Sequence, residues 1–259
     1  EKGSERKNHP LKHEKIMAAS ANSAGQTELS FSFHSKLASH IDPVTINEVD
    51  VKSLLEAFCT EPTMRYQFAH LNEEYLKING CESSMFTLPL ELGNRWLLQD
   101  GRGEQTEPFR RSDSIQAKRE GARFSSLKKA QFVIVPVCTP KVATLIVIPS
   151  TAFVRDLNST MTKSTVLIMS PQPDMQVQIT DIAQSLCGGL REFCEHSLDN
   201  FQLIDSQYLS FRDVNAPLCP LETDRDLYLL EYYHRILFKD CKVFLKKRLD
   251  RMNFRNWFD

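Results

Sequence analysis

The clearest pattern in the sequence is a set of three short apolar runs in its second half. These runs are QFVIVPVC at residues 131–138, ATLIVI at residues 143–148 and STVLIM at residues 164–169. They are rich in β-branched residues, and Thr139-Pro140 separates the first two, as expected of strands joined by a turn. A strand that is apolar at nearly every position is typical of a sheet buried on both faces.

Apolar residues at helical spacing occur on both sides of these runs. Residues 45–100 are mostly helical in pattern, with apolar stripes through residues 51–58 and through residues 68–76. A longer stripe from Ile179 to Cys194 predicts one long helix. Its pair Gly188-Gly189 costs about 1 kcal/mol per glycine relative to alanine, so a bend or break is expected there.

The rest of the chain predicts shorter elements and two polar segments. Phe201–Leu209 is a candidate strand, and Thr223 with Asp226 three residues on resembles the start of a capped helix. Residues 100–127 are charged and glycine-containing, which is typical of a surface loop. Residues 1–44 are expected to be an N-terminal arm, flexible or ordered by a partner, and residues 45–259 to be one α+β domain.

Composition removes several classes of function. The 32 Lys and Arg residues balance 33 Asp and Glu residues, so the chain lacks the net positive charge of a nucleic-acid binder. The apolar runs are too short to span a bilayer, and the first residues have no apolar signal core, so we expect a nuclear or cytosolic protein that is not secreted. Seven cysteines without a CxxC pair predict reduced thiols and no zinc site. No phosphate-cradle, dinucleotide or metalloprotease motif is present, and no cofactor is expected.

Two stretches carry a resemblance to a known family. VIVPVCTPKVATLIVI at residues 133–148 and APLCPLETDR at residues 216–225 resemble segments of the SUMO-specific (Ulp/SENP) cysteine proteases. In that family, an apolar-Pro-apolar strand end, here Val135-Pro136-Val137, is followed by His-Trp at the start of the next strand. A loop with a proline, here Pro217, leads to Asp-Cys-Gly at the start of a helix, and Asp224 matches its aspartate. The similarity covers roughly residues 130–240, and Trp96-Leu97 resembles a tryptophan motif earlier in the family's domain.

The resemblance implies a papain-like α+β fold whose catalytic positions are degenerate. Val142 stands where the family has its histidine, Ser170 at the aspartate, Cys219 at the oxyanion glutamine and Arg225 at the nucleophilic cysteine. Such a protease needs a thiolate at a helix N-terminus, a histidine that accepts its proton, an acid that orients the histidine, and an oxyanion donor. Valine accepts no proton and the guanidinium of arginine is no nucleophile. Ala143 also replaces the tryptophan over the family's substrate tunnel.

We therefore predict a catalytically inactive pseudoprotease that acts as a protein–protein interaction scaffold in a nuclear complex. Its partners are expected to be one or more proteins, and the missing tunnel argues for a ligand other than SUMO or ubiquitin. The candidate binding residues belong to a basic last helix and an aromatic C-terminus. They are Lys242, Lys246, Lys247, Arg248, Arg251, Phe254, Trp257 and Phe258.

Two alternatives remain open at this point. The first is an active cysteine hydrolase with a rearranged site, for which Cys219 is the candidate thiol. The second is a nucleic-acid-associated factor that uses the basic last helix to contact phosphates. Cys194 and His196 form no catalytic pair, because residues two apart on a helix point to different faces. His234 is expected to be a core or rim residue of its helix.

Overall fold

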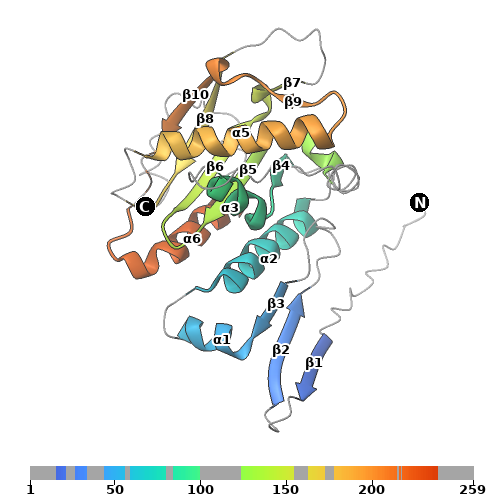
Figure 1. Ribbon diagram of the computed structural model, residues 1–259, viewed down its shortest axis with the longest axis vertical. Helices are drawn as coiled ribbons and strands as arrows, with labels where there is room; N and C mark the ends of the chain where they lie inside the picture. The colour runs from blue at the N-terminus through green and yellow to red at the C-terminus, as the bar shows by residue number, and fades with distance from the viewer. Residues whose placement is uncertain are drawn as a thin grey trace, which may run out of the picture.

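The molecule is built around a mixed β-sheet with helices on both faces (Figure 1). The computed structural model describes residues 16–21, 27–33, 44–55, 59–79, 84–99, 124–154, 163–172, 178–214, 216 and 218–238. Within these residues, the two faces of the sheet hold two separate clusters of buried hydrophobic side chains. This layered α+β arrangement agrees with the fold class predicted from the sequence.

The central sheet has five strands in the order β10-β8-β6-β5-β4. Their bounds are Met85–Thr87 for β4, Phe132–Cys138 for β5, Ala143–Pro149 for β6, Ser164–Met169 for β8 and Leu209–Asp213 for β10. The pairs β5–β6 and β6–β8 are antiparallel, whereas β4–β5 and β8–β10 are parallel. The three apolar runs of the sequence are thus the three inner strands, and every residue of β5 and β6 is buried.

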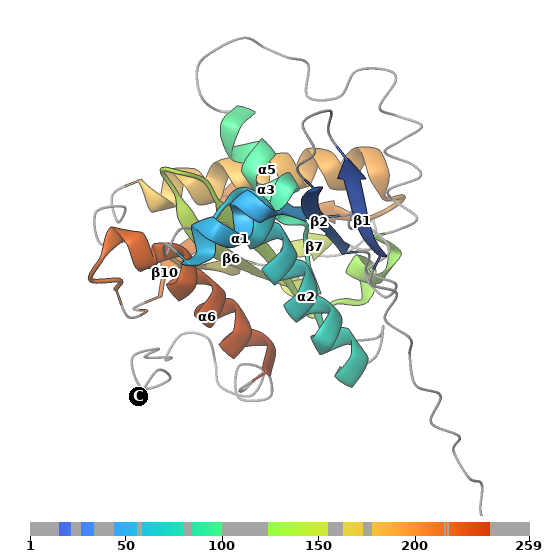
Figure 2. The same ribbon diagram turned by 90° about the horizontal axis from the view of Figure 1, so that it is seen from below.

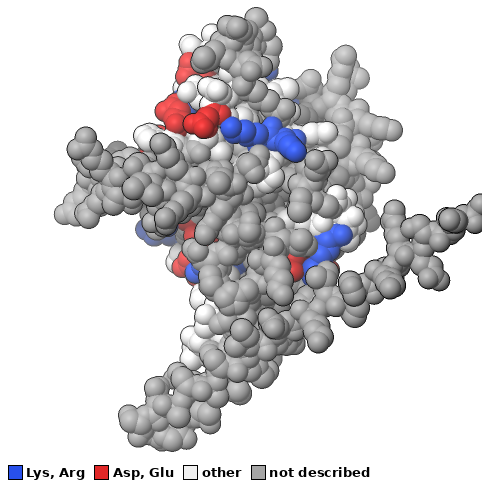
Figure 3. All heavy atoms as spheres, turned by 90° about the vertical axis from the view of Figure 1, so that its right-hand side faces the viewer, with Lys and Arg blue, Asp and Glu red and all other residues white. Residues whose placement is uncertain are grey.

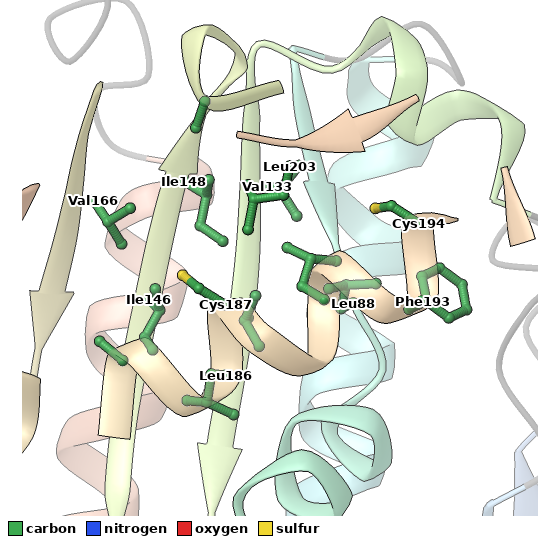
Figure 4. Close-up of a cluster of buried hydrophobic side chains, with 14 of the residues drawn as sticks. Leu88, Val133, Ile146, Ile148, Val166, Leu186, Cys187, Phe193, Cys194 and Leu203 are labelled. Atoms are coloured by element: carbon green, nitrogen blue, oxygen red, sulfur yellow. The ribbon is translucent and has the colours of Figure 1, made fainter. Parts of the chain in front are cut away.

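One face of the sheet is covered by α3 (Leu90–Gln99) and α5 (Ile179–Ser197). Alternate residues of the inner strands point to this side, where Val133 and Ile146 face the apolar stripe of α5 (Figure 4). The long predicted helix is confirmed, but it continues through Gly188-Gly189 to Ser197 without a break. A Cβ atom on Gly189 would lie 2.5 Å from Cγ of Trp96, so this glycine allows α5 and α3 to approach closely.

The opposite face is covered by α2 (Glu61–Asn79) and α6 (Arg225–Phe238), which lie side by side in Figure 2. Ile134, Leu145 and Leu167 point to this side and meet the apolar faces of both helices. The two helices also contact each other, with the rings of Phe68 and Tyr233 4.8 Å apart. The hydroxyl of Tyr233 donates a hydrogen bond to Thr87 Oγ1 at 2.9 Å, so this buried polar atom is satisfied.

A second, antiparallel sheet joins β1 (Ile16–Ala21), β2 (Thr27–Phe33) and β3 (Val44–Asn47). Helix α1 (Glu48–Leu55) follows β3 directly. The buried carboxylate of Asp50 accepts hydrogen bonds from the Asn47 backbone N–H at 2.9 Å and from the Thr60 hydroxyl at 2.6 Å, which fixes α1 to the start of α2. The arm boundary proposed at residue 44 stays a prediction, although β2 pairs with β3 across it.

Three predictions about shorter elements need correction. The strand expected over residues 201–209 is instead a two-residue strand, β9 (Gln202–Leu203), which pairs with β7 (Phe153–Val154), and then β10. Helix α6 begins at Arg225, and the Thr223 hydroxyl donates to Asp224 Oδ1 at 3.3 Å, so Thr223 is not the predicted helix cap. The end of the predicted surface loop forms a 3₁₀ helix at Ser125–Lys129, because Phe124 and Leu127 are buried in the core.

The surface of the described residues shows no single dominant charge in the view of Figure 3, where acidic and basic side chains lie beside one another. No helix in the described part of the chain is both long enough and apolar enough to cross a membrane. Across the same residues, no group of three or more His, Cys, Asp or Glu side chains is arranged to hold a metal ion.

Candidate functional site

The candidate site lies where the β5–β6 hairpin, the end of β8 and the start of α6 come together. Residues 139–142 close the hairpin through a hydrogen bond from Thr139 N–H to Val142 O at 2.8 Å. The Thr139 side chain accepts a second hydrogen bond from Val142 N–H at 3.0 Å. This compact turn holds the buried Val142 directly before β6.

Ser170 follows β8 and lies beside the start of β6. Its hydroxyl donates to Ala143 O at 3.0 Å and accepts from Gln172 N–H at 3.2 Å. Gln172 closes the arrangement, because its Oε1 accepts from Ala143 N–H at 2.8 Å and its Nε2 donates to Lys141 O at 3.2 Å. The side chains of Ser170 and Gln172 are therefore hydrogen-bonded to the backbone of Lys141 and Ala143, the two residues that flank Val142.

Cys219 approaches the same region from the loop before α6. Its backbone N–H donates to Pro171 O at 2.8 Å, which joins this loop to the end of β8. Its thiol is buried and donates to Leu221 O at 2.8 Å. The sulfur thus makes a local turn contact within its own loop.

Arg225 is the first residue of α6, and its side chain is almost fully buried. The guanidinium donates through Nη1 to Pro140 O at 2.9 Å and through Nη2 to Thr139 O at 3.1 Å. Its Nε donates to Asp226 Oδ1 at 3.0 Å. The arginine therefore connects the start of α6 to the hairpin turn, and Asp226 balances its positive charge, which by itself is unfavourable at a helix N-terminus.

The four positions singled out by the sequence thus surround one location. Val142 and Ser170 are joined through Ala143 and Gln172, Cys219 is joined to Pro171, and Arg225 is joined to the turn that precedes Val142. These contacts span up to 86 residues of sequence. The four aligned positions therefore lie on neighbouring segments of the fold.

A cavity of about 590 Å³ opens beside Arg225. It lies between the start of α2, α3, the hairpin turn and the start of α6. Its lining residues are Cys59, Glu61, Met64, Asn94, Cys138, Thr139, Pro140, Glu222, Thr223, Arg225 and Asp226. Only Arg225 among them was identified from the sequence as a site position. Five others, Cys138, Thr139, Pro140, Glu222 and Thr223, lie within the two stretches that resemble the family.

Asn94 shapes one wall of this cavity. Its side-chain amide donates to Cys138 O and its Oδ1 accepts from Cys138 N–H, both at 2.9 Å. The amide therefore pairs with the end of β5 as another strand would. Gly93 permits this approach, because a Cβ atom there would lie 2.2 Å from Pro136 O. The residues are 44 positions apart, and no local pattern predicts the contact.

The thiols near the cavity are poorly suited to act as nucleophiles. Burial, together with the neighbouring Asp226 carboxylate, raises the pKa of Cys138, whose Sγ donates to Asp226 Oδ1 at 3.4 Å. Burial and the same carboxylate also raise the pKa of Cys59. A reactive cysteine needs the opposite environment, in which positive charge or a helix N-terminus lowers the thiol pKa. Both thiols are therefore protonated at neutral pH.

The remaining cysteines and histidines of the sequence analysis lie away from this site. Cys187 and Cys194 are core residues on α5, among aliphatic and aromatic side chains (Figure 4), and burial raises the pKa of each to about 12. Cys194 is buried whereas His196 is exposed, which confirms that they do not face each other. His234 is half-buried on α6, with its ring 5.0 Å from that of Phe238.

Other predicted residues have different outcomes. Trp96 is buried and packs against Phe193, with ring centres 6.2 Å apart, so its ring belongs to the core between α3 and α5. The candidate partner-binding residues between Lys242 and Phe258 lie outside the described residues, as does Pro217. The role proposed for them stays a prediction.

This combination of sheet order, covering helices and an α6 N-terminus facing the β5–β6 hairpin defines a papain-like α+β fold of the Ulp/SENP type. Among solved structures, the chain is similar to a de-sumoylating protease, with a TM-score of 0.56 and 8% sequence identity over 83% of this chain and 75% of that chain. At this identity, the likeness establishes the fold alone.

Two further structures are similar at lower scores. One is a SUMO protease Ulp1 with its catalytic cysteine oxidised to a sulfenic acid, at TM-score 0.47 and 14% identity over 76% of this chain and 74% of that chain. The other is the Ulp1-like SUMO protease catalytic domain from Chaetomium thermophilum, at TM-score 0.44 and 13% identity over 70% and 62% of the two chains. No protein-family model matches the sequence, and no curated protein matches it.

Proposed function

We propose that the chain is a catalytically inactive SUMO-protease-like domain that serves as a protein–protein interaction scaffold in a nuclear complex. The observation that carries this proposal is the environment of Arg225. A protease of this fold needs a free nucleophile at the start of this helix, and here the position holds a guanidinium bonded to Thr139 O, Pro140 O and Asp226. A group held by three hydrogen bonds and protonated at every physiological pH performs no nucleophilic attack.

The neighbouring positions support the same proposal. Val142 supplies no general base, and the Ser170 hydroxyl is bonded to Ala143 O and Gln172 N–H rather than to a side chain at position 142. Replacing one catalytic residue already costs a hydrolase of this kind several orders of magnitude in rate, and here all four positions differ.

The alternative of a rearranged hydrolase centred on Cys219 gains no support from the geometry. Its thiol donates to the Leu221 carbonyl of its own loop, and the loop connects to β8 through the Pro171 carbonyl. A catalytic thiol needs a base within hydrogen-bond reach, and the partner of this sulfur is a backbone carbonyl.

Activity-based labelling tests the loss of catalysis. The full chain is incubated with SUMO and with ubiquitin that carry a thiol-reactive C-terminal electrophile, next to an active Ulp-type protease as positive control. We expect no covalent adduct. An adduct that disappears in Cys219→Ala would establish the rearranged hydrolase instead and contradict the proposal.

Affinity purification from native cells tests the scaffold role separately. We expect one or two proteins to co-purify near equimolar amounts and to resist moderate salt. Recovery of the chain alone, or only with SUMO or ubiquitin conjugates, would count against a scaffold even if the labelling experiment remained negative.

A further inference from the structure

Three exposed apolar side chains lie within ten residues of sequence around the start of α6. Five large hydrophobic side chains are exposed in the described part of the chain, and three of them are Leu218 (45% exposed), Leu221 (59%) and Leu227 (48%). The other two, Val49 and Ile78, lie on α1 and α2. Single exposed leucines are common on soluble proteins, whereas a contiguous exposed apolar patch often marks a binding surface.

The charges in this region are mostly negative. Glu61, Glu222 and Asp226 line the cavity, and Arg225 is the one cation among the described residues that line it. Leu221 and Leu227 are sequence neighbours of Glu222 and Asp226. Three hydrogen bonds already engage the Arg225 guanidinium, one of them to Asp226. The cavity therefore presents the carboxylates of Glu61 and Glu222 without a matching free cation among its lining residues.

We propose that Leu218, Leu221 and Leu227, together with Glu222 and Asp224, form a leucine–carboxylate surface that docks a basic segment of a partner protein. The segment carries arginine or lysine side chains between apolar ones. Arginine and lysine have apolar stems and cationic ends, so their stems contact the leucines while their ends reach the carboxylates of Glu222, which lines the cavity, and Asp224. This inference rests on the proposed scaffold function and specifies its partner chemistry.

The charge of the surface selects this partner over the substrate of an active protease of the same fold. An uncharged glycine-rich tail would gain no electrostatic attraction from Glu61, Glu222 or Asp224. A basic segment is attracted by these carboxylates both during its approach and in the bound complex. The cavity also has room for a long cationic side chain beside Asn94 and Thr139.

A defined peptide probe tests the surface on the full chain. We expect a labelled peptide of alternating arginine and leucine to bind in fluorescence anisotropy, and the same peptide with glutamate for arginine not to bind. The double variants Leu221→Asp/Leu227→Asp and Glu222→Lys/Asp224→Lys should each weaken binding by about tenfold or more. All four side chains lie at least partly at the surface, and thermal unfolding verifies that the variants fold.

Matched controls come from elsewhere on the molecule. Val49→Asp removes an even more exposed apolar side chain from α1, and Glu192→Lys reverses an exposed charge on α5, so neither should change the affinity. No binding of the arginine peptide, or equal losses in the control variants, would overturn the proposal.

Two further outcomes would identify a different occupant and also overturn it. Stronger peptide binding by Lys246→Glu/Lys247→Glu/Arg248→Glu would mean that the chain's own basic segment occupies the surface. Conversion of a dimer to a monomer by the leucine variants, measured by analytical ultracentrifugation, would mean that a second copy does. If the native partner still co-purifies with both double variants, the scaffold function stands and this docking surface is wrong.

Discussion

At the scale of single residues, Arg225 is the most informative side chain. The sequence resemblance aligns it with the family's nucleophile, and its contacts give it a structural role between α6 and the β5–β6 hairpin. A buried cation that hydrogen-bonds to two carbonyls and a carboxylate stabilises the fold only while all its partners remain. The sequence identified the position, and its contacts became visible only in three dimensions.

We expect Arg225→Ala to lower the free energy of unfolding by about 2–4 kcal/mol. The change leaves the carbonyls of Thr139 and Pro140 without a donor and removes the cation beside the poorly exposed Asp226. Urea denaturation measures the difference. Arg235→Ala is the matched control, because its partner Glu231 is about half exposed and such pairs contribute less than about 1 kcal/mol. Equal effects of the two changes would contradict the structural role of Arg225.

The buried thiols of α5 predict a dependence of stability on pH. Burial raises the pKa of Cys194 to about 12 in the folded state, against about 8.5 in an unfolded chain. The folded state therefore keeps a proton that the unfolded state loses, so this contribution to stability is complete below about pH 8.5 and is lost as the pH rises towards 12. The free energy of unfolding therefore falls by up to about 1.4 kcal/mol per pH unit for each such thiol.

Urea denaturation at about pH 7 and about pH 10 checks this expectation. In Cys194→Ala, the fall in unfolding free energy between the two pH values should be smaller than in the unchanged chain by about 1–2 kcal/mol. Alanine at position 194 leaves a small cavity that lowers the unfolding free energy by the same amount at both pH values. This loss therefore cancels when the fall between the two pH values is compared for the variant and the unchanged chain. An unchanged fall would show that the Cys194 thiol ionises in the folded state as it does in the unfolded one.

At the scale of secondary-structure elements, close packing between α3, α5 and β5 sets the geometry of the site. Because Gly189 has no Cβ atom, the Trp96 side chain can contact the backbone of α5. In the same way, Gly93 allows the carbonyl oxygen of Pro136 in β5 to contact the backbone of α3. The sequence predicted the long helix from its apolar stripe, and the break that its glycine pair allowed does not occur. Glycine has a low intrinsic helix propensity. Its presence at position 189 is explained by the close approach of Trp96 on α3, which leaves no room for a Cβ atom.

The two adjacent glycines of α5 form a matched pair for experiment. Gly189→Ala places a Cβ atom within 3 Å of three Trp96 atoms near the indole's attachment to the backbone, so we expect a loss of about 1–3 kcal/mol in unfolding free energy. Gly188→Ala meets nothing within 4 Å and should stabilise the helix by about 0.5–1 kcal/mol. Thermal or urea unfolding measures both. A stabilising Gly189→Ala would mean that α3 and α5 are packed less closely than described.

At the scale of the whole molecule, the central sheet forms the main structural unit. Its two hydrophobic clusters lie on opposite faces of the same strands, whereas the sheet of β1, β2 and β3 is attached through α1 and α2. Three of the four residue pairs between β2 and β3 cross the predicted boundary of the arm at residue 44. The arm and the domain are thus connected by backbone pairing of residues 30–32 with residues 45–47.

We expect a chain that lacks residues 1–43 to unfold cooperatively but at a lower temperature. The deletion removes β2, the partner strand of β3, and leaves the central sheet with its covering helices. We expect the unfolding free energy to fall by about 1–2 kcal/mol, which corresponds to a Tm lower by several degrees. Removal of residues 1–15 alone leaves all three strands in place and should change the Tm little. Loss of a cooperative transition in the larger deletion would show that the arm belongs to the domain.

The sequence by itself determined the inner strands, the long helix and the resemblance to a papain-like α+β fold. These features follow from local patterns, namely apolar runs, helical periodicity and two motifs whose register could be aligned with a family. Other features were decided by the tertiary structure alone. They are the hydrogen bonds between Asn94 and Cys138, the three hydrogen bonds of the Arg225 side chain, and the cavity that is lined by Cys59, Cys138 and Asp226 among others. These contacts join residues that are distant in sequence, and their energy depends on burial and direction, which no local pattern of residue types encodes.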